Sequence, residues 1–115
     1  MPDAMINEDL GYPIVVGDNL RASLSEFVRK EQRPKVLLCD ANKRVQAIAD
    51  EIARLAGNPP VLPFTLGEKR KRLATVESVL DAMVRAGVER GDLVMGVGGG
   101  VASDLFGFAA AIYMR

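Results

Sequence analysis

The chain has 115 residues, 49% of them apolar and 26% charged, which is typical of one globular domain. Fifteen Lys and Arg balance fifteen Asp and Glu, so no net basic field favours nucleic acid or an anionic membrane as a partner. With no histidine and one cysteine, a zinc site of the usual type, a His-based acyl-transfer triad and an internal disulfide are excluded. We expect a cytoplasmic protein, because the first residues also lack a basic segment followed by an apolar stretch.

Four short apolar runs predict buried strands, and each precedes a segment with helical spacing. In chain order the runs are PIVVG (13–17), KVLLCD (35–40), VLPF (61–64) and LVMGVG (93–98). The apolar positions predicted to face inward are Leu20, Leu24, Phe27 and Val28 in the first helix, Val45, Ile48, Ala49, Ile52 and Ala53 in the second, and Leu73, Val76, Val79, Leu80, Met83 and Val84 in the third. A last, unusually apolar helix is expected over 101–115.

Four steps of strand followed by helix predict an α/β fold. Right-handed crossovers then give an open, Rossmann-like parallel sheet with helices on both faces. Residues 1–11 are expected to be a lead-in segment, and residues 12–115 to form the domain. Ligands of such sheets bind at the carboxyl ends of the strands, so the residues that follow each apolar run are the candidates for function.

Three consecutive glycines, Gly98 to Gly100, follow the last apolar run. Their backbone N–H groups can approach a ligand closely, and the next helix adds the positive end of its dipole, so both features favour a pyrophosphate. A tight turn that packs the helix against the strand explains the same glycines equally well. Asp104 is expected in the first turn of the helix, where the dipole stabilises an acid. As a ligand contact it would face a ribose hydroxyl or the nicotinamide side, because it would repel phosphate.

Two other strand ends carry polar residues. Asp40 and Asn42 follow the second run, where an acid can accept hydrogen bonds from ribose hydroxyls, although both residue types are also preferred helix N-caps. The segment LGEKRKR (66–72) follows the third run, and its four cations form either a solvated basic face or a phosphate contact. Cys39 is expected to be a small buried hydrophobe rather than a nucleophile.

The combination of DAN (40–42), LGEKRK (66–71) and GGGVASDLFGFAAAIYMR (98–115) resembles 3-dehydroquinate synthase of the sugar phosphate cyclase superfamily. The resemblance runs from Tyr12 to Arg115 and covers only the family's amino-terminal dinucleotide-binding domain. One departure is Ser103, where the family usually has glycine. The chain is therefore expected to be incomplete at its carboxyl end and to stop before the family's helical metal-binding domain.

The resemblance implies which residues bind the cofactor NAD. They are Asp40, Ala41 and Asn42 in the first segment, Glu68, Lys69, Arg70 and Lys71 in the second, and Gly99, Gly100, Val101 and Asp104 in the third. It also implies a homodimer in which Arg115 reaches the neighbouring subunit's substrate, although a cation that complements the helix dipole is the alternative for Arg115. No catalytic residue or metal ligand is expected in this chain, because the family's divalent metal, zinc or cobalt, is bound by the carboxyl-terminal domain.

The implied activity is a phosphate-eliminating lyase reaction of the shikimate pathway, in aromatic amino acid biosynthesis. It converts the phosphorylated keto-acid sugar 3-deoxy-D-arabino-heptulosonate 7-phosphate to 3-dehydroquinate and phosphate, and these 115 residues alone are expected to be inactive. One alternative is another sugar phosphate cyclase or a metal-dependent alcohol or glycerol dehydrogenase, although such dehydrogenases usually have serine where Val101 follows the glycines. The other is a non-catalytic nucleotide-binding module, which the lack of metal ligands favours.

Overall fold

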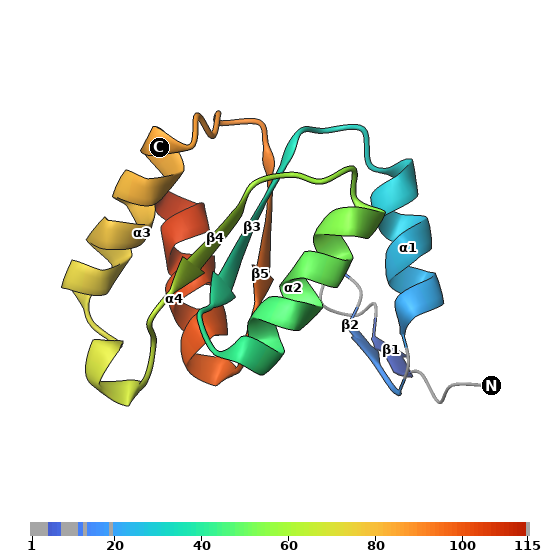
Figure 1. Ribbon diagram of the computed structural model, residues 1–115, viewed down its shortest axis with the longest axis horizontal. Coiled ribbons are helices and arrows are strands. Elements are labelled where there is room, and N and C mark those ends of the chain that lie inside the picture. The colour runs from blue at the N-terminus through green and yellow to red at the C-terminus, as the bar shows by residue number, and fades with distance from the viewer. Residues whose placement is uncertain (1–4, 8–11, 13, 19, 115) are drawn as a thin grey trace. The chain divides into compact units, whose positions relative to one another are not determined.

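A computed structural model describes residues 5–7, 12, 14–18 and 20–114 (Figure 1). The chain divides into two compact units, Met1–Glu31 and Gln32–Arg115. In the first unit, β1 (Met5–Asn7) pairs antiparallel with β2 (Ile14–Val16), and α1 spans Arg21–Lys30.

The first predicted strand is therefore not part of the parallel sheet. Its partner is β1, which lies within the segment expected as a lead-in. An apolar run indicates that a strand forms, but the partner of that strand depends on contacts that the run itself does not contain.

The second unit contains the parallel sheet, with strand order β4-β3-β5. The central strand is β3 (Lys35–Asp40), flanked by β4 (Val61–Phe64) and β5 (Leu93–Val97). In the register, Leu38 lies opposite Leu62 on one side and Gly96 on the other. The Rossmann-like parallel sheet that the sequence predicts is confirmed here, with three of its four expected strands.

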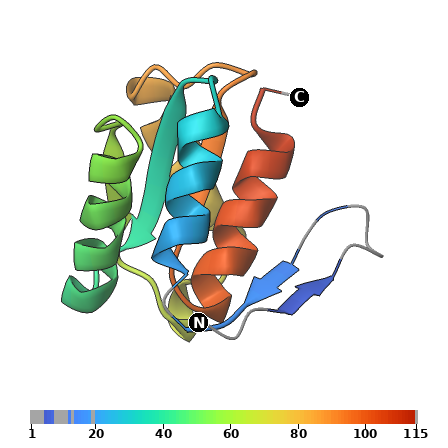
Figure 2. The same cartoon turned by 90° about the vertical axis from the view of Figure 1, so that its right-hand side faces the viewer.

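Helices cover both faces of this sheet (Figure 2). Side chains alternate along a strand, so Leu37 and Cys39 face one side, where α2 (Lys43–Leu55) packs. Val36 and Leu38 face the other side, where α3 (Leu73–Arg85) and α4 (Gly100–Ile112) complete the larger core. All four strand residues are buried, as expected for a strand covered on both faces.

Close packing of α4 on the sheet depends on a glycine. A Cβ on Gly96 would lie 3.3 Å from Cδ2 of Phe106, whose ring lies 5.8 Å from that of Phe64, centroid to centroid. Phe108 and Ile112, on the same helix, are exposed. The aromatic residues of α4 are therefore divided between core and surface.

Some predicted inward positions are wrong. The exposed positions, each more than half accessible, are Phe27, Ile48, Leu73 and Val84. Leu73 is the first residue of α3, and Val84 is turned about 100° from the buried Met83, because a helix has 3.6 residues per turn. Among the described residues, no helix is both long and apolar enough to cross a membrane.

Candidate functional site

The three candidate segments lie at one edge of the sheet, on the lower side in Figure 1. Because the strands are parallel and adjacent, the carboxyl ends of β3, β4 and β5 meet there. β3 leads into Asp40, β4 into the 3-10 turn η1 (Glu68–Arg70), and β5 into the glycine turn.

The three glycines have two different roles. Gly98 has φ +156°, and a Cβ on it would lie 2.5 Å from Cβ of Ala102 and 3.7 Å from Cβ of Asp40. No side chain fits there, so Gly98 allows α4 to pack closely and brings the turn against Asp40. A Cβ on Gly99 or Gly100 would meet no atom within 4 Å. The tight-turn explanation therefore applies to the first glycine, while the other two face open space.

The amino end of α4 has no side-chain cap. Gly99 is the N-cap residue and has no side-chain oxygen to accept a hydrogen bond from the first-turn N–H groups. The helical bonds begin with the N–H of Ser103 donating to the Gly99 carbonyl at 2.9 Å, so Ser103 is part of the first helical turn. Val101 packs its side chain against the core, which leaves only its backbone for a ligand.

In the segment after β3, one residue caps a helix and another has an oxygen available to a ligand. Asn42 is the N-cap of α2, and its side chain accepts a 2.9 Å bond from the N–H of Arg44. Asp40 accepts a 3.1 Å bond at Oδ1 from the N–H of Asn42, and the N–H of Ala41 donates to the Phe64 carbonyl. Within the described residues, Oδ2 of Asp40 has no hydrogen-bond donor, so capping explains Asn42 but not the second carboxylate oxygen of Asp40.

An ion pair joins the basic segment to α4. Nζ of Lys71 lies 2.8 Å from Oδ2 of Asp104, with both side chains about half exposed. The hydrogen bond to Asp104 and its negative charge raise the pKa of Lys71 above its ordinary value, and Glu68 adds to this rise. Asp104 is the fifth residue of α4, so its expected place in the first turn is wrong, since the helix begins one residue before Val101.

The remaining candidate residues are Lys69, Arg70, Arg115 and Cys39. Lys69 and Arg70 are exposed in η1, and Arg115 lies outside the described residues. Cys39 is fully buried in the core beneath α2, and burial, followed by the charges of Asp50 and Asp40, raises the pKa of its thiol. A thiol held in its neutral form is a poor nucleophile, which confirms the expected packing role.

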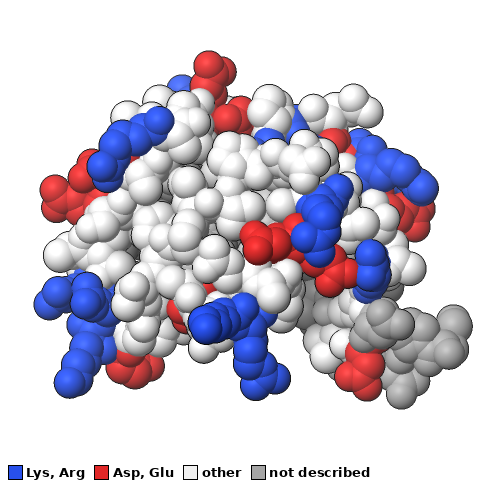
Figure 3. All heavy atoms as spheres, in the orientation of Figure 1, with Lys and Arg blue, Asp and Glu red and all other residues white. Residues whose placement is uncertain are grey.

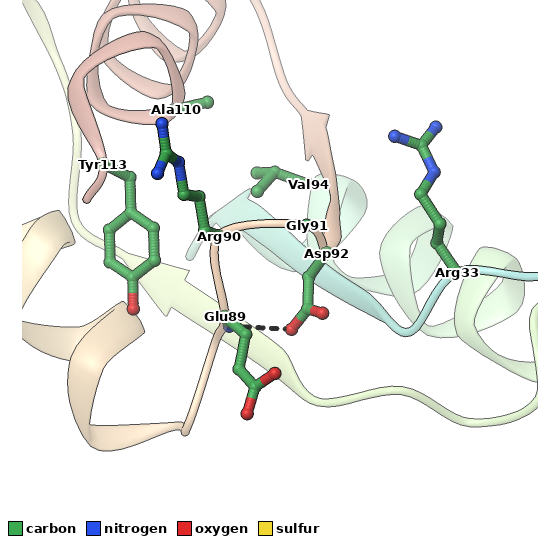
Figure 4. A pocket seen from close by; sticks show the side chains of 8 residues that line it. All are labelled: Arg33, Glu89, Arg90, Gly91, Asp92, Val94, Ala110 and Tyr113. Carbon is green, nitrogen blue, oxygen red and sulfur yellow. Dashed lines mark hydrogen bonds between the residues drawn. The ribbon is translucent and has the colours of Figure 1, made fainter. Parts of the chain in front are cut away.

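A hollow of about 260 Å³ lies at the opposite, amino edge of the sheet (Figure 4). In its lining, Oδ2 of Asp92 accepts from the N–H of Glu89 at 2.9 Å, whereas the side chains of Glu89 and Arg90 have no partner among the described residues. The buried hydroxyl of Tyr113 donates to the Val88 carbonyl at 2.5 Å, and burial raises the pKa of this tyrosine. Sequence patterns did not indicate this hollow, because its walls come from loops and a helix end far apart in the chain.

No metal centre is found in the described part of the chain, where no group of three His, Cys, Asp or Glu side chains is placed to hold an ion.

A family model and two curated relatives to which the chain is similar all carry the name 3-dehydroquinate synthase. Residues 61–115 match the family model of the 3-dehydroquinate synthase N-terminal domain. The chain is 34% identical over 102 residues to 3-dehydroquinate synthase of Saccharolobus solfataricus, covering 89% of this chain and 27% of that protein. It is 33% identical over 109 residues to the Streptococcus pneumoniae enzyme, covering 90% of this chain and 31% of that one. The chain thus spans less than a third of these relatives.

Solved structures support the fold. A crystal structure of 2-deoxy-scyllo-inosose synthase, complexed with carbaglucose-6-phosphate, NAD+ and Co2+, superposes with a TM-score of 0.75 at 22% identity. The match covers 100% of this chain and 33% of that one. A second structure of 2-deoxy-scyllo-inosose synthase gives a TM-score of 0.73, also at 22% identity, over 100% of this chain and 34% of that one.

Proposed function

We propose that the chain is the NAD-binding part of a 3-dehydroquinate synthase, because residues 61–115 match the model of that family's amino-terminal domain. The whole protein would convert 3-deoxy-D-arabino-heptulosonate 7-phosphate to 3-dehydroquinate and phosphate. The homodimer, the substrate contact of Arg115 and a divalent metal bound outside this chain are parts of the same proposal.

The observation that carries the proposal is the convergence of three strand-end segments on one edge. Asp40 lies against the glycine turn, and Lys71 reaches across to Asp104 at 2.8 Å. These contacts connect all three segments, which are separated by tens of residues along the chain.

The groups at this edge fit a dinucleotide. The open backbone at Gly99 and Gly100 and the uncapped first turn of α4 offer N–H donors and a positive dipole end to a pyrophosphate. Oδ2 of Asp40 offers an acceptor to a ribose hydroxyl. Lys71 neutralises Asp104, so this acid lies beside the turn with its charge balanced and repels a pyrophosphate less than a free carboxylate would.

Bound NAD would supply a reversible hydride acceptor for one substrate hydroxyl. The chain's own residues would hold and orient it: backbone N–H groups of the glycine turn at the phosphates, Asp40 at a ribose, and Asp104 with Lys71 beside the turn. Since no described residue group can hold a metal, we expect no turnover from these 115 residues alone, measured as phosphate release.

Calorimetric titration with NAD tests the proposal. Gly99→Val should leave the fold intact, because a Cβ there meets no atom within 4 Å, but its branched side chain would occupy the space of the ligand. We expect NAD affinity to fall by about tenfold or more, the size of one or two lost backbone hydrogen bonds to a charged group.

Gly91→Val is the matched control. Gly91 has equally open surroundings but lies at the amino edge of the sheet, so its substitution should leave NAD affinity unchanged. Equal affinities for the two variants, or no NAD binding by the folded native chain, would show that the site is wrongly assigned.

A further inference from the structure

A second hollow, of about 220 Å³, lies beside the carboxyl end of β4 and the start of α3. It is lined by the end of β4, the basic segment and one face of α3. Of the residues predicted to bind NAD, only Arg70 lines it, so its walls are largely distinct from the candidate nucleotide site.

The basic segment, residues 66–72, has cations that point in two directions. Lys71 is paired with Asp104, whereas Arg70 and Arg72, on either side of it in sequence, line the hollow. Within the described residues neither guanidinium has an ion pair or a side-chain hydrogen bond. Figure 3 shows Lys and Arg side chains gathered over η1 and the adjoining start of α3, at the lower left of that view. The hollow thus holds two uncompensated positive charges and no carboxylate in its lining.

Hydroxyl groups and a helix end complete the lining. Thr65 and Thr75 face the hollow, and no hydrogen bond of either hydroxyl is found in the described part of the chain. Ser78 also lines it, with its hydroxyl donating to the Ala74 carbonyl at 3.2 Å. The 13-residue helix α3 begins here with Arg72 at its N-cap position and no side-chain cap, so the dipole adds positive potential.

We propose that this hollow binds a phosphoryl group, either free phosphate or a phosphate monoester. Two guanidinium groups offer forked N–H donors that match phosphate oxygens, and threonine hydroxyls donate to the oxygens that remain. The absence of any lining carboxylate removes the repulsion that a dianion would otherwise meet. This site is separate from the glycine turn, and Arg70 is the one lining residue that it shares with the predicted nucleotide site.

The test is a titration of the folded, 15N-labelled 115-residue chain with inorganic phosphate at constant ionic strength, followed by NMR. Saturable shifts are expected at the amides of Thr65, Arg70 and Thr75. Arg72→Gln should weaken phosphate binding about tenfold through loss of a charge-assisted bond, while Arg54→Gln on α2, which removes the same charge elsewhere, should leave it unchanged. Equal weakening by both variants, or the absence of saturation, would overturn the proposal.

Two further measurements distinguish a loss of phosphate binding from a loss of folding, and the phosphate site from the nucleotide site. Thr75→Val preserves charge and shape, and we expect it to weaken phosphate binding about threefold, with thermal unfolding verifying that the variant remains folded. Saturating NAD should still allow phosphate to bind, because Arg70 is the one lining residue shared by the two sites, and mutually exclusive binding would contradict a separate site. Phosphate binding without NAD binding would contradict only the proposed function.

The source of the phosphoryl group is identified by a parallel titration with glycerol 3-phosphate. Tighter binding of the monoester, lost in Arg72→Gln, supports an organic phosphate as the ligand. Equal or weaker binding of the monoester supports free phosphate.

Discussion

At the amino edge of the β4-β3-β5 sheet, two side chains that line a hollow of about 260 Å³ are bonded to nearby backbone groups, whereas at the carboxyl edge several polar groups have no partner among the described residues. At the amino edge Asp92 receives the N–H of Glu89, and Tyr113 donates to the Val88 carbonyl. At the carboxyl edge the first turn of α4 lacks a side-chain cap, and Oδ2 of Asp40 has no described donor.

The difference shows that the size of a hollow does not identify a binding site. Buried and partly buried polar groups in folded proteins normally have hydrogen-bond partners, so groups left without one are available to a ligand. The proposed binding site is therefore the carboxyl edge, where such groups adjoin the open glycine turn, although the larger of the two hollows described above lies at the amino edge.

Gly98→Ala is expected to have the largest effect on stability. It tests whether Gly98 is required for packing, unlike Gly99 and Gly100, whose surroundings are open. A Cβ at this position would lie 2.5 Å from Cβ of Ala102, at a φ of +156°. We expect a loss of about 2–3 kcal/mol in the free energy of unfolding, measured by denaturant titration. Gly107→Ala, in the open middle of α4, is the control and should stabilise slightly. A loss no greater than that of the control would mean that α4 does not pack as described.

Asp40→Asn tests whether Oδ2 of Asp40, at the carboxyl edge of the sheet, binds the ligand. Asparagine can still accept the bond from the N–H of Asn42, so stability should change by less than about 0.5 kcal/mol. NAD affinity should fall about tenfold, because a neutral amide replaces the charged acceptor for the ribose. A loss of stability with unchanged affinity per folded molecule would assign Asp40 a local structural role instead.

Tyr113→Phe tests the amino edge of the sheet and has the smallest expected effect of the three variants. The variant loses the buried hydrogen bond to the Val88 carbonyl, which should lower the free energy of unfolding by about 1 kcal/mol without changing NAD affinity. Since burial raises the pKa of Tyr113 in the folded chain, its contribution is complete below the ordinary pKa of 10.0 and is lost as pH rises through the folded value. Unfolding curves of the two proteins should therefore converge at alkaline pH. A gap that persists or a changed NAD affinity would contradict this assignment.

The sequence alone located the strand ends and therefore the candidate edge. Alternating or continuous apolar runs predict strands, and the polar residues that follow them are ordered along the chain, so Asp40, Lys71 and Gly99 could be assigned to one edge without coordinates. The motifs also predicted the family that the comparisons support.

Other features depended on contacts that no local pattern contains. The pairing of Ile14–Val16 with β1, the separate roles of Gly98 and its two neighbours, and the ion pair between Lys71 and Asp104 each involve residues apart in the sequence or the exact start of a helix. Propensity acts within a few residues, whereas strand partners, close approaches and unpaired charges are decided by packing between distant segments, which only the tertiary structure brings together.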